Sequence, residues 1–119
     1  MPVEYHNRFI DGRRLSWDVQ KLRSAASSMP QITVPLADIF EFDSVYWFDD
    51  QFLPTCRAVA DHARRIATAD LSDPVLLSPD GHVIDGMHRI ARAALDGLDS
   101  IMAIRLDEYP EPDRVSEAG

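Results

Sequence analysis

The chain has 119 residues, of which 45% are hydrophobic, and it carries a formal net charge of −8 with a single cysteine. This length suits one domain with a modest core, and one cysteine excludes a disulfide framework. The excess of acidic residues disfavours nucleic acid as the main partner, because phosphate contacts require Lys and Arg. No apolar run is long enough to span a membrane and the N-terminus is polar, so we expect a cytoplasmic protein without a signal peptide.

Two regions flank the predicted main domain. Residues 1–30 form an extension in which Asp11-Gly12 is a favoured two-residue hairpin turn. Ser16 is the predicted N-cap of a helix over Trp17–Ser27, since the apolar residues there keep helical spacing. We expect this extension to pack on the main sheet, with a homodimer contact as the alternative. Residues 107–119 are polar and acidic and are predicted to be a flexible tail.

The main domain is predicted over residues 31–106 and opens with a strand at Ile32–Pro35. The following stretch, residues 40–52, contains six aromatic and four acidic residues and no basic one. Such a segment is either a buried wall or a lid over a pocket, and its rings suit stacking on a purine base. The carboxylates of Glu41 and Asp43 are of the kind that phosphoryl transfer uses to bind a metal ion or to accept a hydroxyl proton.

A helix is predicted over Pro54–Thr68. Its apolar positions form one stripe, which includes Cys56, so the thiol is expected to be buried. Arg64-Arg65 lies off this stripe and is expected to face water, with a phosphate or a partner protein as the alternative contact.

The stretch after residue 73 changes its apolar period twice. Two short apolar runs, Pro74–Leu77 and His82–Ile84, flank a turn that ends in Gly81. Helical spacing then begins at Met87 and stops near Gly97. The stripe of that helix comprises Met87, Ile90, Ala91, Ala94, Leu95 and Leu98. With a further apolar run from residue 101 to 104, the sequence predicts strand, turn, strand, glycine corner, helix and strand.

The glycine corner is the predicted functional site. A helix that opens at Gly86-Met87 leaves its first N–H groups unpaired, and their partial positive charge favours a phosphate. His88, Arg89 and Arg92 are spaced so that all three can project from the face opposite the apolar stripe. Asp85 can cap the helix, orient His88 or hold a metal ion for a nucleotide. The alternative interpretation is an ordinary turn followed by a solvated helix.

The pentapeptide Asp85-Gly86-Met87-His88-Arg89, followed by an alanine-rich helix and a closing strand, resembles the corner of the ParB/sulfiredoxin superfamily. The resemblance spans about residues 32–106 and implies an α/β (α+β) fold with a small mixed sheet flanked by helices. Met87 occupies the position of the reactive cysteine of sulfiredoxins, which disfavours their chemistry because a thioether is not that nucleophile. The Asp-Gly-x-His-Arg order is most similar to the free-serine kinase branch.

The resemblance implies binding of ATP or ADP with Mg²⁺ at the corner, and transfer of a phosphoryl group to a small hydroxylated metabolite or hydrolysis of the nucleotide. The implied nucleotide-binding residues are Asp85, Gly86, Met87, His88, Arg89 and Arg92. His88 is also a candidate catalytic residue. The free-serine kinases carry a catalytic glutamate after the first strand, for which Glu41 is the nearest match and Asp43 the reserve. The alternatives are a non-catalytic regulatory or protein-interaction module and a DNA-binding ParB-like protein.

Overall fold

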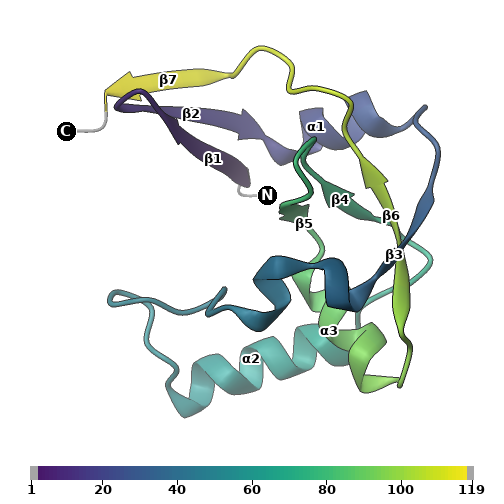
Figure 1. Cartoon of the computed structure of the whole chain (residues 1–119). Coiled ribbons are helices and arrows are strands. Elements are labelled where there is room, and N and C mark those ends of the chain that lie inside the picture. The colour runs from purple at the N-terminus through teal and green to yellow at the C-terminus, as the bar shows by residue number, and fades with distance from the viewer. Residues whose placement is uncertain (1–2, 118–119) are drawn as a thin grey trace.

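The computed structural model describes residues 3–117, which form a mixed α/β arrangement of three helices and two sheets (Figure 1). The N-terminal sheet has three antiparallel strands in the order β1-β2-β7, and the central sheet has four strands in the order β3-β6-β4-β5. The elements are β1 (Tyr5–Ile10), β2 (Arg13–Asp18), α1 (Val19–Ala26), β3 (Ile32–Pro35), α2 (Cys56–Ala67), β4 (Val75–Leu77), β5 (Val83–Asp85), α3 (Met87–Leu95), β6 (Ser100–Arg105) and β7 (Arg114–Glu117). No helix in this part of the chain is both long and apolar enough to cross a membrane.

The central sheet confirms the element order predicted for the stretch after residue 73. Strand β4 pairs antiparallel with β5 and parallel with β6, and β3 adds antiparallel to the other side of β6. Helix α3 therefore lies in the connection between two parallel strands, which places its start beside the end of β5. The prediction of a small mixed sheet is therefore confirmed, since the sheet contains both parallel and antiparallel pairs.

Strand β4 separates two apolar clusters because alternate side chains point to opposite faces of the sheet. Val75 and Leu77 join the cluster that contains the buried side of α3, whereas Leu76 joins the cluster that contains α1. The helix of the N-terminal extension thus covers one face of the central sheet and α3 covers the other. Packing of the extension on the main sheet is as expected.

The N-terminal hairpin forms at the predicted turn, where Asp11 and Gly12 have φ values of 52° and 76°. The predicted cap is wrong, because β2 continues past Ser16 and the carboxylate of Asp18 accepts the hydrogen bond from the backbone N–H of Gln20. Helix α1 consequently starts two residues later than predicted.

The segment after residue 106 carries more structure than its polar composition indicates. Strand β7 pairs antiparallel with β2, and the Trp17 indole N–H donates to the carbonyl oxygen of Pro110 at 2.8 Å. The Tyr109 ring packs on Trp17 with centroids 4.5 Å apart. Both ends of the described chain therefore meet in one sheet, and residues 118 and 119 of the predicted tail lie outside the described residues.

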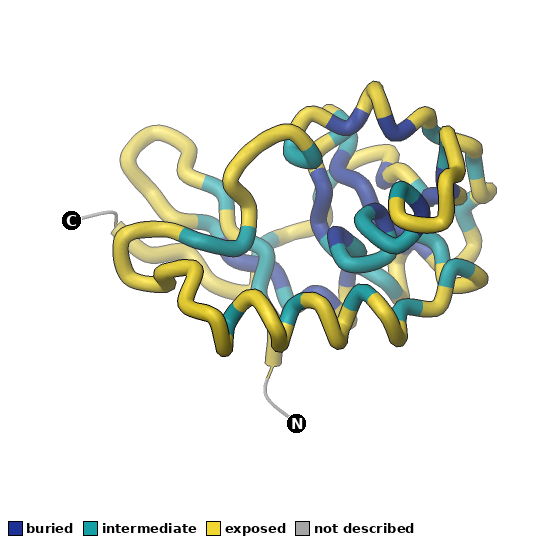
Figure 2. The backbone as a smooth tube through the Cα atoms, turned by 90° about the horizontal axis from the view of Figure 1, so that it is seen from below, coloured by how far each residue is buried: buried dark blue, intermediate teal, exposed yellow. Residues whose placement is uncertain are grey.

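Helix α2 is formed as predicted but faces a different way. Cys56 is exposed, so the prediction of a buried thiol is wrong, and Val59 is 49% exposed. The half-buried row is instead Ala58, His62 and Ile66, at a spacing of four residues. Figure 2 shows α2 lying along the near side of the molecule with most of its length exposed. The apolar stripe is thus turned largely toward solvent.

Candidate functional site

Gly86 forms a tight corner between β5 and α3. Its φ is +123°, and a Cβ built on it would lie 3.0 Å from Cγ2 of Val75, so a larger residue is disfavoured on both counts. No side chain among residues 3–117 caps the helix, and the first N–H shown bonding back into the turn is that of Ile90, which donates to the Gly86 carbonyl. The start of α3 therefore keeps the unpaired amides and the positive potential of a helix N-terminus.

Arg89 is held by protein groups beside this corner. Its side chain is 11% exposed, and Nη1 donates to the backbone carbonyls of Asp73 at 3.1 Å and Pro74 at 3.0 Å. The guanidinium also pairs with carboxylate oxygens of Asp73 at 3.0 Å and Asp85 at 3.2 Å. It therefore ties α3 to the loop before β4, and contact with a phosphate would require exchange of one of these partners.

Asp85 belongs to the same ion-pair network. Its Oδ2 accepts from Nη1 of Arg23 at 2.6 Å, and Nη2 of Arg23 reaches Asp73 at 2.5 Å. Two arginines and two aspartates thus form a charge-balanced cluster, which we call the ionic lock: Arg23, Asp73, Asp85 and Arg89. Asp85 serves this lock and does not cap α3. Arg23 was not among the predicted site residues, since nothing in the local sequence links it to the corner.

His88 lies in an aromatic environment. Its Nε2 is 2.8 Å from Nδ1 of His62, and the indole of Trp47 stacks on both rings with centroids 4.7 Å from His88 and 4.5 Å from His62. The Phe48 ring meets His62 edge-on at 5.4 Å. We call His62, His88 and Trp47 the aromatic clamp. Burial, followed by the neighbouring His62, lowers the pKa of His88 to about 4, so the ring is neutral at pH 7.

The sequence did not single out His62 or Trp47 as site residues. His62 lies off the predicted apolar stripe of its helix, and Trp47 is one of six rings in residues 40–52, which we call the aromatic segment. The available signal was a histidine among charged residues on a helix that would have to pack next to the corner.

Glu41 and Asp43 have different surroundings. Glu41 Oε2 accepts from the backbone N–H of Val83 at 2.8 Å and lies 3.4 Å from Nδ1 of His82, whereas Oε1 is buried without a hydrogen-bond partner among the described residues. Partial desolvation, followed by the charges of Glu41 and Asp85, raises the pKa of the Tyr46 phenol, although the residue as a whole is 41% exposed. The structure thus brings Glu41 to the strand that leads into the corner, while Asp43 lies at the surface.

Arg92 connects α3 to its C-terminal surroundings. Its Nε lies 3.0 Å and 3.1 Å from the two carboxylate oxygens of Asp96, and Nη1 donates to the backbone carbonyl of Ala67 at the end of α2. Unlike Asp85 and Arg89, it does not join the cluster at the corner. Its contacts help to hold α2 and α3 side by side.

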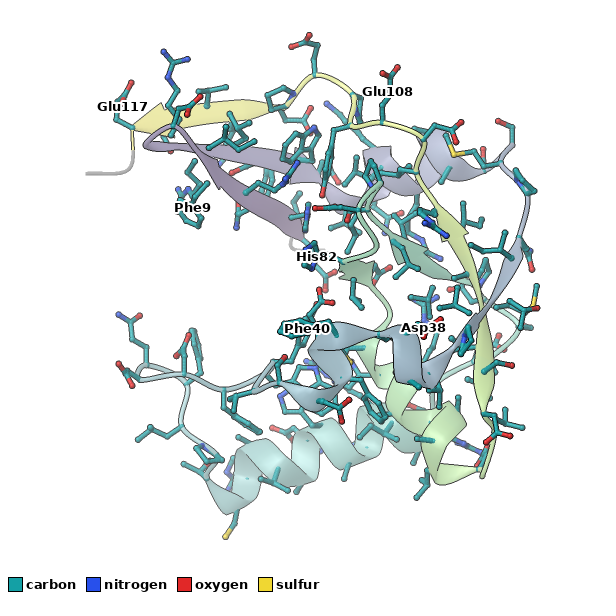
Figure 3. All side chains as sticks on the ribbon, in the orientation of Figure 1. Phe9, Asp38, Phe40, His82, Glu108 and Glu117 are labelled. Atoms are coloured by element: carbon teal, nitrogen blue, oxygen red, sulfur yellow. The ribbon has the colours of Figure 1, made fainter. Side chains whose placement is uncertain are left out.

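Cavities lie on several sides of these elements, and one of about 260 Å³ is lined by Arg23 and Asp73 of the ionic lock. Two others lie near Glu41 and His82. One of about 260 Å³ lies between the aromatic segment and α3 and is lined by Glu41, Phe42, Ser44, Val45, Tyr46, Trp47, Phe48, Met87 and Ala91. A second, of about 380 Å³, is bordered by β3, Arg105 and the three residues Asp38, Phe40 and His82 that Figure 3 labels. The cavity beside α3 adjoins the predicted corner, with Met87 in its wall. Within residues 3–117, no three His, Cys, Asp or Glu side chains gather to hold a metal ion.

No model of a known protein family matches the chain, and searches of characterised proteins and of solved structures found no match.

Proposed function

We propose that this chain is a ParB/sulfiredoxin-like protein that binds ATP or ADP with Mg²⁺, with the phosphates at the start of α3. The observation that carries the proposal is the Gly86 corner, where a positive φ and a lack of room for a Cβ, which would lie 3.0 Å from Val75, accompany an uncapped helix N-terminus. A backbone that turns this tightly exposes successive N–H groups to one ligand, and phosphate is the group they favour. The adjoining cavity with its aromatic wall supports a base-bearing ligand.

The proposed roles follow from which groups already have partners. The amides after Gly86 contact the phosphate oxygens, and the neutral His88 contributes one ring N–H. Arg89 stays in the ionic lock, where it fixes the corner. Mg²⁺ arrives with the nucleotide and is held by phosphate oxygens and water, which matches its usual preference.

The proposed reaction is transfer of the terminal phosphoryl group to a small hydroxylated metabolite. The hydroxyl oxygen forms a bond to the phosphorus, the bond to the nucleoside diphosphate oxygen breaks, and the hydroxyl proton passes to a base. Glu41 is the base we propose, because one of its carboxylate oxygens lacks a protein partner. Asp43 is exposed and is the weaker candidate.

The test is a thermal-shift panel with ATP, ADP and CTP at millimolar concentration, each with Mg²⁺. Selective binding to the native state should raise the melting temperature, since a ligand at 100 times its Kd adds about 2.7 kcal/mol. Gly86→Ala should abolish the shift while Gly97→Ala, at a corner with no neighbour within 4 Å, should keep it. A panel without any nucleotide-dependent rise contradicts the proposal.

A second candidate function is protein interaction, and the outward apolar stripe of α2 favours it. Val59 of α2 is exposed, as are Phe52 and Leu53 shortly before the helix. The helix also carries three exposed arginines, Arg57, Arg64 and Arg65, of which Arg64 pairs with Asp61 at 2.9 Å. An amphipathic, acidic segment of another protein is the occupant whose charge complements it. With a purified partner, Val59→Asp should weaken binding at least tenfold while Val115→Asp leaves it unchanged. An equal affinity for both variants contradicts this candidate.

A further inference from the structure

The aromatic clamp joins three segments that are far apart in the sequence. Trp47 comes from the aromatic segment, His62 from α2 and His88 from the first turn of α3. The centroids of His62 and His88 are 5.1 Å apart at an interplanar angle of 17°, so the rings are nearly parallel. The indole lies over both imidazoles. A movement of either imidazole therefore changes the contacts of Trp47, which belongs to the segment that lines the cavity beside α3.

The contact between the imidazoles has only two neutral arrangements. At 2.8 Å, Nδ1 of His62 and Nε2 of His88 form a hydrogen bond that holds one proton. If His88 donates, its Nδ1 is a bare lone pair and repels an anion. If His62 donates, the proton of His88 sits on Nδ1 and can be given to a phosphate oxygen.

We propose that His62 is a positioning residue that places the proton of His88 on Nδ1, and that Trp47 locks this arrangement. The inference rests on the proposed function, since the purpose of that proton is to contact the bound phosphate. His62 itself touches neither the phosphate nor the reacting atoms. It acts through the orientation and the tautomer of His88.

The surroundings of His88 favour its neutral form. Burial and the neighbouring His62 lower its pKa most, Arg65 of α2 lowers it further, Asp85 of β5 raises it, and Arg89 of α3 lowers it by the smallest amount. Asp85 is largely satisfied by the ionic lock. The aromatic neighbours Trp47 and Phe48 add no formal charge, so the low pKa of His88 has no strong acidic partner to oppose it.

Protonation of both imidazoles would disrupt the clamp, whereas a single added proton leaves one ring nitrogen able to accept the hydrogen bond. Two imidazolium rings at this separation lose their hydrogen bond and repel each other, because no lone pair remains to accept. The stack with Trp47 would open as a result. At neutral pH, a bound phosphate should favour the arrangement in which His62 donates and His88 carries its proton on Nδ1. In acid, protonation of both rings should release the aromatic segment.

The first test needs no ligand and uses the full chain. Long-range ¹H–¹⁵N spectra assign the tautomer and the titration of each imidazole, and the indole N–H of Trp47 is identified by its loss in Trp47→Phe. We expect the Nδ1–H tautomer for His88 and a movement of the Trp47 resonance in step with its protonation. A dominant Nε2–H tautomer in the wild-type protein overturns the inference without any variant.

Two substitutions separate positioning from packing. His62→Phe keeps a ring against Trp47 but removes the hydrogen bond, whereas His62→Asn keeps an N–H donor near the Nδ1 position. In His62→Phe we expect the His88 ring to shift toward the Nε2–H tautomer. We expect the nucleotide affinity of this variant to fall roughly tenfold. His62→Asn should restore the Nδ1–H tautomer and most of the affinity. Identical His88 spectra in wild type and His62→Phe overturn the inference.

Failure of the proposed nucleotide binding and failure of the His62 inference give different results. If the wild-type protein binds no nucleotide but His88 changes its tautomer in His62→Phe, the proposed function fails and the positioning of His88 by His62 is still measured. If nucleotide binds and His62→Phe changes neither the tautomer nor the affinity, the proposed function stands and His62 has no positioning role.

Discussion

The two sides of the first turn of α3 are built from opposite chemistry. Arg89 is held by the ionic lock, with two carboxylates and two carbonyl oxygens as partners. The adjacent residue, His88, is held by the aromatic clamp, where burial keeps its imidazole neutral at pH 7. Neighbouring residues of one motif therefore serve different purposes: Arg89 fixes the backbone and His88 remains able to respond to a ligand or to pH.

The difference follows from the elements that each side meets. The Arg89 side faces α1 and the loop before β4, which supply Arg23 and Asp73. The His88 side faces α2 and the aromatic segment. A charged side chain with several matched partners has little freedom, whereas stacked rings are bound by weaker and less directional forces.

Removal of the Arg89 guanidinium from the ionic lock should cause the largest loss in the free energy of unfolding. Arg89→Met keeps the length of the side chain but leaves Asp73 and Asp85 with Arg23 alone and two carbonyls without a donor. We expect a loss of about 3 kcal/mol in the free energy of unfolding, which urea denaturation measures. Arg92→Met removes a more exposed ion pair, and about 1 kcal/mol is expected for this control. Equal losses in the two variants would mean that the lock does not stabilise the corner.

The corner itself should be the next most sensitive position. Gly86→Ala forces a Cβ into a backbone with φ of +123° and against Val75, for an expected loss of about 2 kcal/mol. Gly97→Ala shares the positive φ, at +80°, but meets no atom within 4 Å, so about 1 kcal/mol is expected from strain alone. Thermal or urea unfolding of both variants measures the difference. A smaller loss of unfolding free energy in Gly86→Ala than in Gly97→Ala would contradict the predicted clash between the added Cβ and Val75.

The clamp side predicts a pH dependence with a definite sign. The pKa of His88 is about 4 in the folded chain, against an ordinary 6.5, so the unfolded state binds more protons between these values. Stability should therefore fall as the pH falls from about 6.5 toward 4. His88→Gln removes this titration and should flatten the curve of unfolding free energy against pH in that window. His6→Gln should remove a second contribution to this curve, because burial also lowers the pKa of His6, at a site near Tyr109 rather than the clamp.

The smallest expected effect belongs to Cys56, at the exposed start of α2. Its thiol should react with a thiol-specific reagent in the native protein at nearly the rate of a free peptide. Cys56→Ser should change the unfolding free energy by less than about 0.5 kcal/mol, since no packing is lost. Slow reaction that speeds up only on unfolding would place Cys56 in the core after all and would reverse the orientation of α2.

Much of the central sheet could be predicted because its signals are local. The change from apolar runs to helical spacing at Met87 located α3, and the Asp-Gly and Gly-containing turns located both hairpins. The glycine corner was predicted for the same reason. Its unusual backbone conformation is required by the meeting of a strand end with a helix start, and both appear in a few consecutive residues.

The rest depends on contacts between distant segments. Nothing near Arg23 in the sequence reveals Asp85, and nothing in the polar C-terminal segment reveals that β2 has a free edge for β7. The orientation of α2 was mispredicted because its apolar stripe was assumed to face the core. The stacking of His62 with Trp47 and His88 turned a row containing a polar ring inward instead.

The most direct test of the central claim is an NMR titration of the ¹⁵N-labelled chain with ATP or ADP and Mg²⁺. The account predicts saturable shifts that are largest for the backbone amides of residues 86–90, together with the His88 ring. Shifts confined to other elements, or no saturable change at millimolar nucleotide, would contradict a phosphate site at the start of α3.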